Sequence, residues 1–168
     1  MTIETGTLTL NKMMIQKAEG DCPIYTPGES YDSILFQAAL AAKWKEPPRD
    51  ALDTMILSTS GQDLSRCDAY EQLDFTPFDP RSKRTEAQLK GPDGKIFRVT
   101  KGAPHVILGM CHNKADIELL VESKIMELGS RGVRSLALAR MDDEDGQVFQ
   151  TSQCPCVSCM QDFAKRLV

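Results

Sequence analysis

The sequence predicts an α+β domain in which a mainly antiparallel, twisted sheet is flanked by helices. Helical and extended patterns are mixed along the chain, and short turns rich in Gly, Pro and Asp join the extended runs as hairpins. The chain lacks regular crossover helices and the glycine-rich strand-to-helix turn of doubly wound folds. Hairpins of this kind build antiparallel sheets.

Length and composition are those of one folded domain. The chain has 168 residues, of which 41% are hydrophobic and 26% charged, so a real core is expected. Its net charge of −4 argues against nucleic acid as a partner. No apolar run reaches the roughly 18 residues that span a bilayer, and no signal-peptide pattern opens the chain. Its cysteines are expected to be reduced thiols.

The first part of the chain contains one expected strand and two expected helices. Residues 5–16 are rich in threonine and alternate loosely, which favours a strand, and residues 17–28 contain the prolines and glycines of a loop. Residues 30–43 are expected to form a helix with a serine cap, because apolar residues recur at helical spacing. Asp50 opens a second helix, and the polar residues 58–66 are expected to be a loop.

The middle of the chain is expected to be rich in strands. Residues 70–78 are extended, and two prolines near their end limit strand pairing. The extended runs 84–90 and 95–100 flank Gly91-Pro92-Asp93-Gly94, which is typical of a turn. These two runs therefore predict a β-hairpin.

Two helices and a strand follow the hairpin. Residues 103–111 predict a helix that tolerates a proline in its first turn. Residues 115–130 predict the clearest helix of the chain, because their apolar side chains share one face and Gly132 follows as a stop. Residues 133–140 are then expected to be a strand.

The last part of the chain is harder to interpret. Asp145-Gly146 predicts a second hairpin into residues 147–149, and residues 151–168 are expected to be an irregular tail that closes with a short helix at 160–167. Cys156-Val157-Ser158-Cys159 has the two-residue gap of zinc and redox sites.

A metal site in the tail is not predicted. A structural zinc ion normally takes four ligands, and only Cys154, Cys156 and Cys159 cluster there. His105 or His112 could supply a fourth ligand, but nothing in the sequence brings either close to the tail.

Phe78 and Lys83 are the first candidates for nucleotide recognition. A nucleotide needs a flat apolar face for its base and cations for its phosphates. The segment Phe75–Thr85 contains both, with Phe78 followed five residues later by Lys83. A core aromatic side chain beside a solvated basic turn would have the same sequence.

Lys101 and Gly102 open the string Lys101-Gly102-Ala103-Pro104, which stands between an expected strand and an expected helix. A lysine in this place can lie half-buried near an aromatic ring, and a glycine permits close approach of a ligand. The alternative is an ordinary strand-to-helix turn with a surface lysine.

Two acidic residues and one arginine complete the candidate site. Asp50 and Asp53 are three residues apart at an expected helix start, so both lie on one helix face, although Asp50 could simply cap the helix. Arg134 begins an expected strand, and its guanidinium suits phosphate oxygens. An exposed strand arginine is the alternative.

These strings, together with Thr5-Gly6-Thr7-Leu8-Thr9, resemble the nucleotide-binding domain of P-type ATPases in their order and in their amino-acid sequence. They resemble the plasma-membrane proton pumps most closely. The resemblance implies that Phe78 stacks on the adenine of ATP and that Lys83 and Lys101 line the pocket. It also implies that Asp53 meets the base edge or the ribose and that Arg134 meets the phosphates. In this family an aspartate accepts the phosphoryl group, but Ile3 and Glu4 stand where the family has Asp and Lys.

The chain is therefore expected to bind ATP, with Mg²⁺ arriving only as the ATP complex, and to contain no catalytic residue. Residues 1–16 are expected to be a hinge strand of the phosphorylation domain, 17–150 the nucleotide-binding domain and 151–168 a divergent tail, with the recognisable resemblance ending after residue 150. The implied partners are the phosphorylation, actuator and transmembrane domains of a pump, on the cytoplasmic side of a membrane. In isolation a monomer is expected. The alternative is a truncated relative that acts as a nucleotide sensor or as a protein-interaction module.

Overall fold

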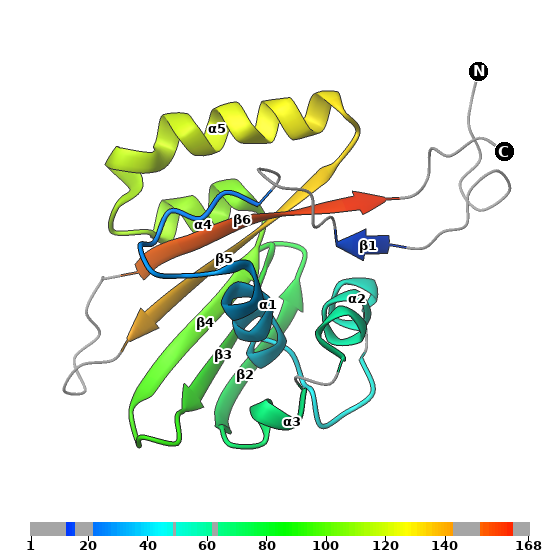
Figure 1. The fold of residues 1–168 in the computed structure, drawn as a ribbon, viewed down its shortest axis with the longest axis vertical. Coiled ribbons are helices and arrows are strands. Elements are labelled where there is room, and N and C mark those ends of the chain that lie inside the picture. The colour runs from blue at the N-terminus through cyan, green and yellow to red at the C-terminus, as the bar shows by residue number, and fades with distance from the viewer. Residues whose placement is uncertain (1–12, 16–21, 49, 62–63, 143–151, 163–168) are drawn as a thin grey trace, which may run out of the picture.

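The computed structural model describes residues 13–15, 22–48, 50–61, 64–142 and 152–162. They form a six-stranded sheet in the order β1-β6-β5-β4-β3-β2, and every neighbouring pair is antiparallel (Figure 1). The α+β prediction is confirmed. The strands are β1 (Met13–Ile15), β2 (Glu71–Asp79), β3 (Arg84–Lys90), β4 (Ile96–Gly102), β5 (Arg134–Asp142) and β6 (Ser152–Asp162). The helices are α1 (Tyr31–Leu40), α2 (Ala51–Ser60), α3 (Leu64–Cys67), α4 (Pro104–Met110) and α5 (Lys114–Ser130).

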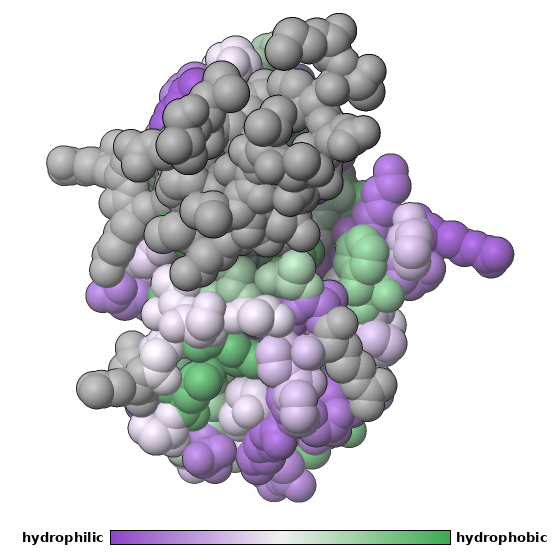
Figure 2. All heavy atoms as spheres, turned by 90° about the vertical axis from the view of Figure 1, so that its right-hand side faces the viewer, coloured by the Kyte–Doolittle hydropathy of each residue, from purple (hydrophilic) through white to green (hydrophobic). Residues whose placement is uncertain are grey.

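Helices cover both faces of the sheet (Figure 1). Helices α1 and α2 pack with Leu89, Val99 and Leu138 in the larger apolar cluster, whereas α4 and α5 pack with Ala137 and Ala139 in the smaller one. Neighbouring strand residues point to opposite faces of a sheet. Consecutive residues of β5 therefore enter the two different clusters. Among the described residues visible in Figure 2, hydrophilic and hydrophobic ones are interspersed.

The helix starts follow the local sequence. The Ser30 side chain accepts from the Ser33 backbone N–H while the Ser33 side chain accepts from the Ser30 backbone N–H, which forms a capping box. The Asp50 carboxylate accepts from the Asp53 backbone N–H at 2.7 Å. Both predicted helix starts are thus confirmed, since each depends on contacts only three residues apart.

The prediction of a loop over residues 58–66 is wrong. Helix α2 continues through Ser60, and α3 begins at Leu64. The hydroxyls of Ser58, Thr59 and Ser60 donate to backbone carbonyls three or four residues earlier, so these polar side chains are satisfied inside the helix. Leu64 then packs against the larger apolar cluster.

The predicted hairpin between β3 and β4 is confirmed. Gly91 N–H donates to the Lys95 carbonyl at 2.8 Å, and Gly94 has a φ of 81°, which favours glycine. Strand β2 lies at the edge of the sheet, with an irregular register between Thr76 and Asp79. This matches the expectation that the prolines in this segment limit its pairing.

The prediction of an irregular tail with a helix at 160–167 is wrong for the described residues. Strand β6 runs from Ser152 to Asp162 and lies between β5 and β1. The register between β5 and β6 shifts at Cys154 and Pro155, which lie opposite Ala139. This irregularity accommodates Pro155, which has no backbone N–H to donate. Residues 1–12, the turn at Asp145-Gly146, residues 147–149 and residues 163–168 lie outside the described part. No helix in the described part has the length and apolarity needed to cross a membrane.

Candidate nucleotide-binding site

All seven predicted site residues line one cavity of about 440 Å³. The cavity lies where the start of α2, the turn between β2 and β3, the end of β4 and the start of β5 come together. A volume of this size is within the range of small-molecule sites. The residues are Asp50, Asp53, Phe78, Lys83, Lys101, Gly102 and Arg134.

Lys101 is buried, with only 3% of its surface exposed, and its ammonium forms an ion pair and hydrogen bond with Asp53. The Nζ atom also lies 3.5 Å from the Ala38 carbonyl. Burial lowers the pKa of Lys101, and the negative charges of Asp53 and Asp50 oppose this shift. Lys101 is buried more deeply than the expected half-buried lysine, because strand alternation directs this side chain to the face that α1 and α2 cover.

The two acidic residues have different structural roles. The Asp50 carboxylate caps α2, as the structural alternative anticipated. Asp53, one turn later, is buried and faces Lys101. In the described structure, then, the Asp53 carboxylate already has a cationic partner.

Gly102 is required by the packing of the chain itself. A Cβ atom at this position would lie 2.4 Å from the Lys83 carbonyl oxygen and 2.8 Å from the Arg84 Cα. The same Lys83 carbonyl accepts a hydrogen bond from the Ala103 backbone N–H at 3.0 Å. The two sequence motifs are therefore joined through their backbones.

The turn that carries Lys83 is stabilised by an aspartate. Asp79 accepts hydrogen bonds from the backbone N–H groups of Arg81 and Ser82 at 3.0 and 3.3 Å. Lys83 has a φ of 52°, an uncommon value for a residue other than glycine, and its N–H donates to the Asp79 carbonyl. Neighbouring backbone groups thus hold Lys83 in this conformation.

Phe78 is not a core residue. It lies on edge strand β2 and lines the cavity, and 47% of its surface is exposed. An aromatic ring that is half exposed leaves apolar area available to a ligand. The alternative of a core aromatic side chain is wrong for this position.

Arg134 is the first residue of β5 and is exposed. It follows Val133, which is buried. This anchored neighbour holds the start of the strand in place and leaves the arginine at the cavity.

Sequence reasoning missed several lining residues. Thr85 is buried and lies opposite Lys101 in the β3–β4 register, a pairing that the predicted hairpin could have revealed. Leu52, Pro80, Ala103, Ser135 and Leu136 also line the cavity, and all of them except Ser135 are apolar. Pro80 and Ala103 lie within the quoted strings, but residues of these types occur throughout the chain, so none was selected as a site residue.

Comparison with known proteins shows close relatives, although no protein-family profile matches the chain. It is 53% identical over 142 residues to two proteins from Leishmania donovani, "Probable proton ATPase 1A" and "Probable proton ATPase 1B". It is 36% identical over 172 residues to "Plasma membrane ATPase 1" of Saccharomyces cerevisiae. The chain is homologous to a segment of the proton ATPases.

The proton ATPases are much longer than this chain. The matches cover 84% of the chain but 14% of each Leishmania protein, and 98% of the chain but 18% of the yeast protein. The predicted resemblance to P-type proton ATPases is thus confirmed for a fragment. With 98% of the chain covered, the yeast alignment extends beyond residue 150, where the sequence motifs could no longer be recognised.

Proposed function

We propose that the chain is the ATP-binding domain of a P-type proton-transporting ATPase. The observation that carries this proposal is the convergence of seven residues, singled out for nucleotide recognition from sequence, on one cavity. They come from segments as far apart in the sequence as Asp50 and Arg134. Random placement would not gather an exposed aromatic ring, three cations and a backbone-constrained glycine at the same cavity.

The charges of the cavity suggest a division of roles. Asp53 already meets the charge of Lys101 at the buried end. Lys83 and Arg134 stand at the same cavity and would attract phosphate oxygens, since a guanidinium and an ammonium both suit phosphate. Phe78 would stack on the base. On this proposal Lys101 and Asp53 shape the closed end of the pocket.

The reaction requires parts that we assign to the remainder of a pump. Phosphoryl transfer depends on an acceptor, Mg²⁺ and correct positioning. Ile3 and Glu4 replace the aspartate and lysine of the family motif, so the described residues would bind and orient ATP for an aspartate elsewhere. The proposed partners are the phosphorylation, actuator and transmembrane domains, and the proposed location is the cytoplasmic side of a membrane.

Amide NMR shifts during titration with ATP and AMP test the proposal. We expect shifts to cluster on residues around Phe78, Lys101 and Arg134. Replacing Phe78 by Ala should weaken ATP binding on the order of tenfold, because base stacking on an aromatic ring contributes roughly 1–3 kcal/mol.

Leu73→Ala is the matched control for Phe78→Ala. Leu73 lies on the same strand and is similarly exposed, at 44% against 47%, but does not line the cavity. ATP affinity should be unchanged in this variant. Absence of shifts with either nucleotide would instead favour the protein-interaction module, and equal binding by Phe78→Ala and the parent would refute the stacking role.

A further inference from the structure

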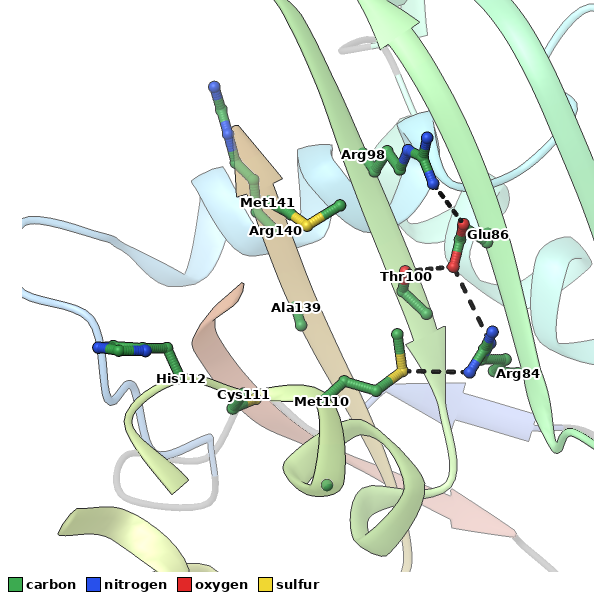
Figure 3. Close-up of a pocket in the computed structure, with 11 residues that line it drawn as sticks. Arg84, Glu86, Arg98, Thr100, Met110, Cys111, His112, Ala139, Arg140 and Met141 are labelled. Atoms are coloured by element: carbon green, nitrogen blue, oxygen red, sulfur yellow. Dashed lines mark hydrogen bonds and ion pairs between the residues drawn. The ribbon is translucent and has the colours of Figure 1, made fainter. Parts of the chain in front are cut away.

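A second cavity lies on the opposite face of the sheet, under the end of α4 (Figure 3). Its volume is about 550 Å³, and strands β3, β4 and β5 contribute to its lining. Arg84 lines this cavity, whereas the next residue, Thr85, lines the candidate nucleotide cavity. Strand alternation separates these two neighbours, so the second cavity is distinct from the first.

A charged cluster occupies one wall of this cavity. Glu86 lies 3.9 Å from the Arg84 guanidinium and 3.7 Å from that of Arg98. Glu86 also accepts a hydrogen bond from the Thr100 hydroxyl at 3.2 Å. Figure 3 shows these four side chains directed toward one another from β3 and β4.

Arg84 is weakly engaged by its neighbours. Its ion pair with Glu86 is at the long end of the range for such contacts, and the one hydrogen bond of its side chain within the described part of the chain goes to the thioether of Met110 at 3.3 Å. A thioether is a weak acceptor, whereas a guanidinium has five N–H donors in a rigid fork. An oxyanion would satisfy these donors better than sulfur does.

Arg140, at the same cavity, is better matched than Arg84. Arg140 contacts Asp142 at 2.7 Å and lies over the Phe97 ring at 4.2 Å. His112 lies at the rim beside the end of α4, where it is exposed. Arg84 therefore has more to gain from a ligand than Arg140 does.

We propose that this second cavity binds a small anionic molecule, with its carboxylate or phosphate group at Arg84 and its apolar part against Met110. Arg98 adds positive charge near the anion, and Glu86 competes with the anion for Arg84. A cavity of this size and a fork of donors suit a small metabolite.

The test uses amide NMR on the whole chain, with inorganic phosphate and succinate as probes and chloride at matched ionic strength as the reference. We expect shifts on Thr100, Gly109 and Met110 that chloride does not cause. A phosphate response without a succinate response identifies a phosphate ligand, and the reverse identifies a carboxylate. Shifts only around Gly102 and Ser135 would mean that the probe enters the nucleotide cavity, and would overturn the proposal.

Two variants change the affinity in opposite directions. Arg84→Gln should weaken binding about ten- to a hundredfold, because the charge-assisted hydrogen bonds to the anion are lost. Glu86→Gln should strengthen it, because the competing carboxylate is removed. Arg131→Gln is the matched control, since Arg131 carries the same charge, lies at the end of α5 and does not line the cavity. Unchanged affinity in both Arg84→Gln and Glu86→Gln would overturn the proposal. If one of the two variants does not fold, unchanged affinity in the other overturns it.

Discussion

The buried ion pair between Lys101 and Asp53 should dominate the response of this domain to substitution. Lys101→Met and Asp53→Leu each remove one charge and leave the other buried without its partner. The double variant replaces both charges with apolar groups of similar size. The three variants and the parent form a thermodynamic cycle that isolates the interaction.

The structure sets the size of the expected effect. Lys101 and Asp53 are both buried, so solvent screens their charges poorly. Removing one partner of a buried pair costs about 3–5 kcal/mol. For a domain of this length, that loss lowers the melting temperature by about 6–20 °C. The double variant should be close to the parent in stability, since exchange of a buried pair for apolar residues is often neutral.

Urea unfolding followed by circular dichroism measures these free energies. The exposed pair between Lys114 and Glu118, 3.3 Å apart on α5, is the matched control. Lys114→Met and Glu118→Leu should each change the stability by less than about 1 kcal/mol. Single-variant losses at Lys101 and Asp53 as small as those of the control would refute the claim that this pair is buried in solution.

Three further predictions concern stability. Gly102→Ala should destabilise the domain by about 1–3 kcal/mol, because the new Cβ would meet the Lys83 carbonyl. Gly129→Ala inside α5, where a Cβ would have nothing within 4 Å, should stabilise the domain by up to about 1 kcal/mol. Thermal unfolding compares the two variants. Asp50→Ala should cost about 1 kcal/mol in urea unfolding, and Asp50→Asn should cost less because Asn also caps helices. Burial lowers the pKa of Lys101 in the folded state. At a pH just below 10.5, the ordinary pKa of lysine, the unfolded chain therefore binds more protons at this residue than the folded chain does. The stability of the parent relative to Lys101→Met should therefore rise as the pH increases toward that value, and a falling difference in urea titrations would contradict this.

Local features of the fold were predictable from sequence because their causes are local. The caps at Ser30 and Asp50 depend on hydrogen bonds that reach three residues along the chain. The hairpin turn at Gly91–Gly94 likewise depends on adjacent residues. Strand β6 was missed, since a strand with a proline and a bulge is defined by the neighbours that pair with it, and those lie elsewhere in the sequence.

Sequence also indicated which residues line the candidate site, because the short strings that contain them occur in the order known from the family. The geometry of the site was not predictable. The sequence led us to expect a half-buried Lys101, but the structure buries it and pairs it with Asp53, 48 positions away. Sequence reasoning assigned Gly102 to close approach of a ligand, whereas the Lys83 carbonyl already makes glycine necessary there.

The sequence by itself determined the fold class, most helix and strand positions, the relationship to proton ATPases and the seven residues of the candidate site. Only the tertiary structure decided which of those residues face each other, that Phe78 is half exposed, and that a second cavity lies behind Arg84. The physical reason is the separation along the chain over which each interaction acts. Capping, turn conformation and periodicity act within a few residues, whereas burial and the pairing of charges arise only when α1 and α2 join the apolar cluster on the sheet and the strands assemble.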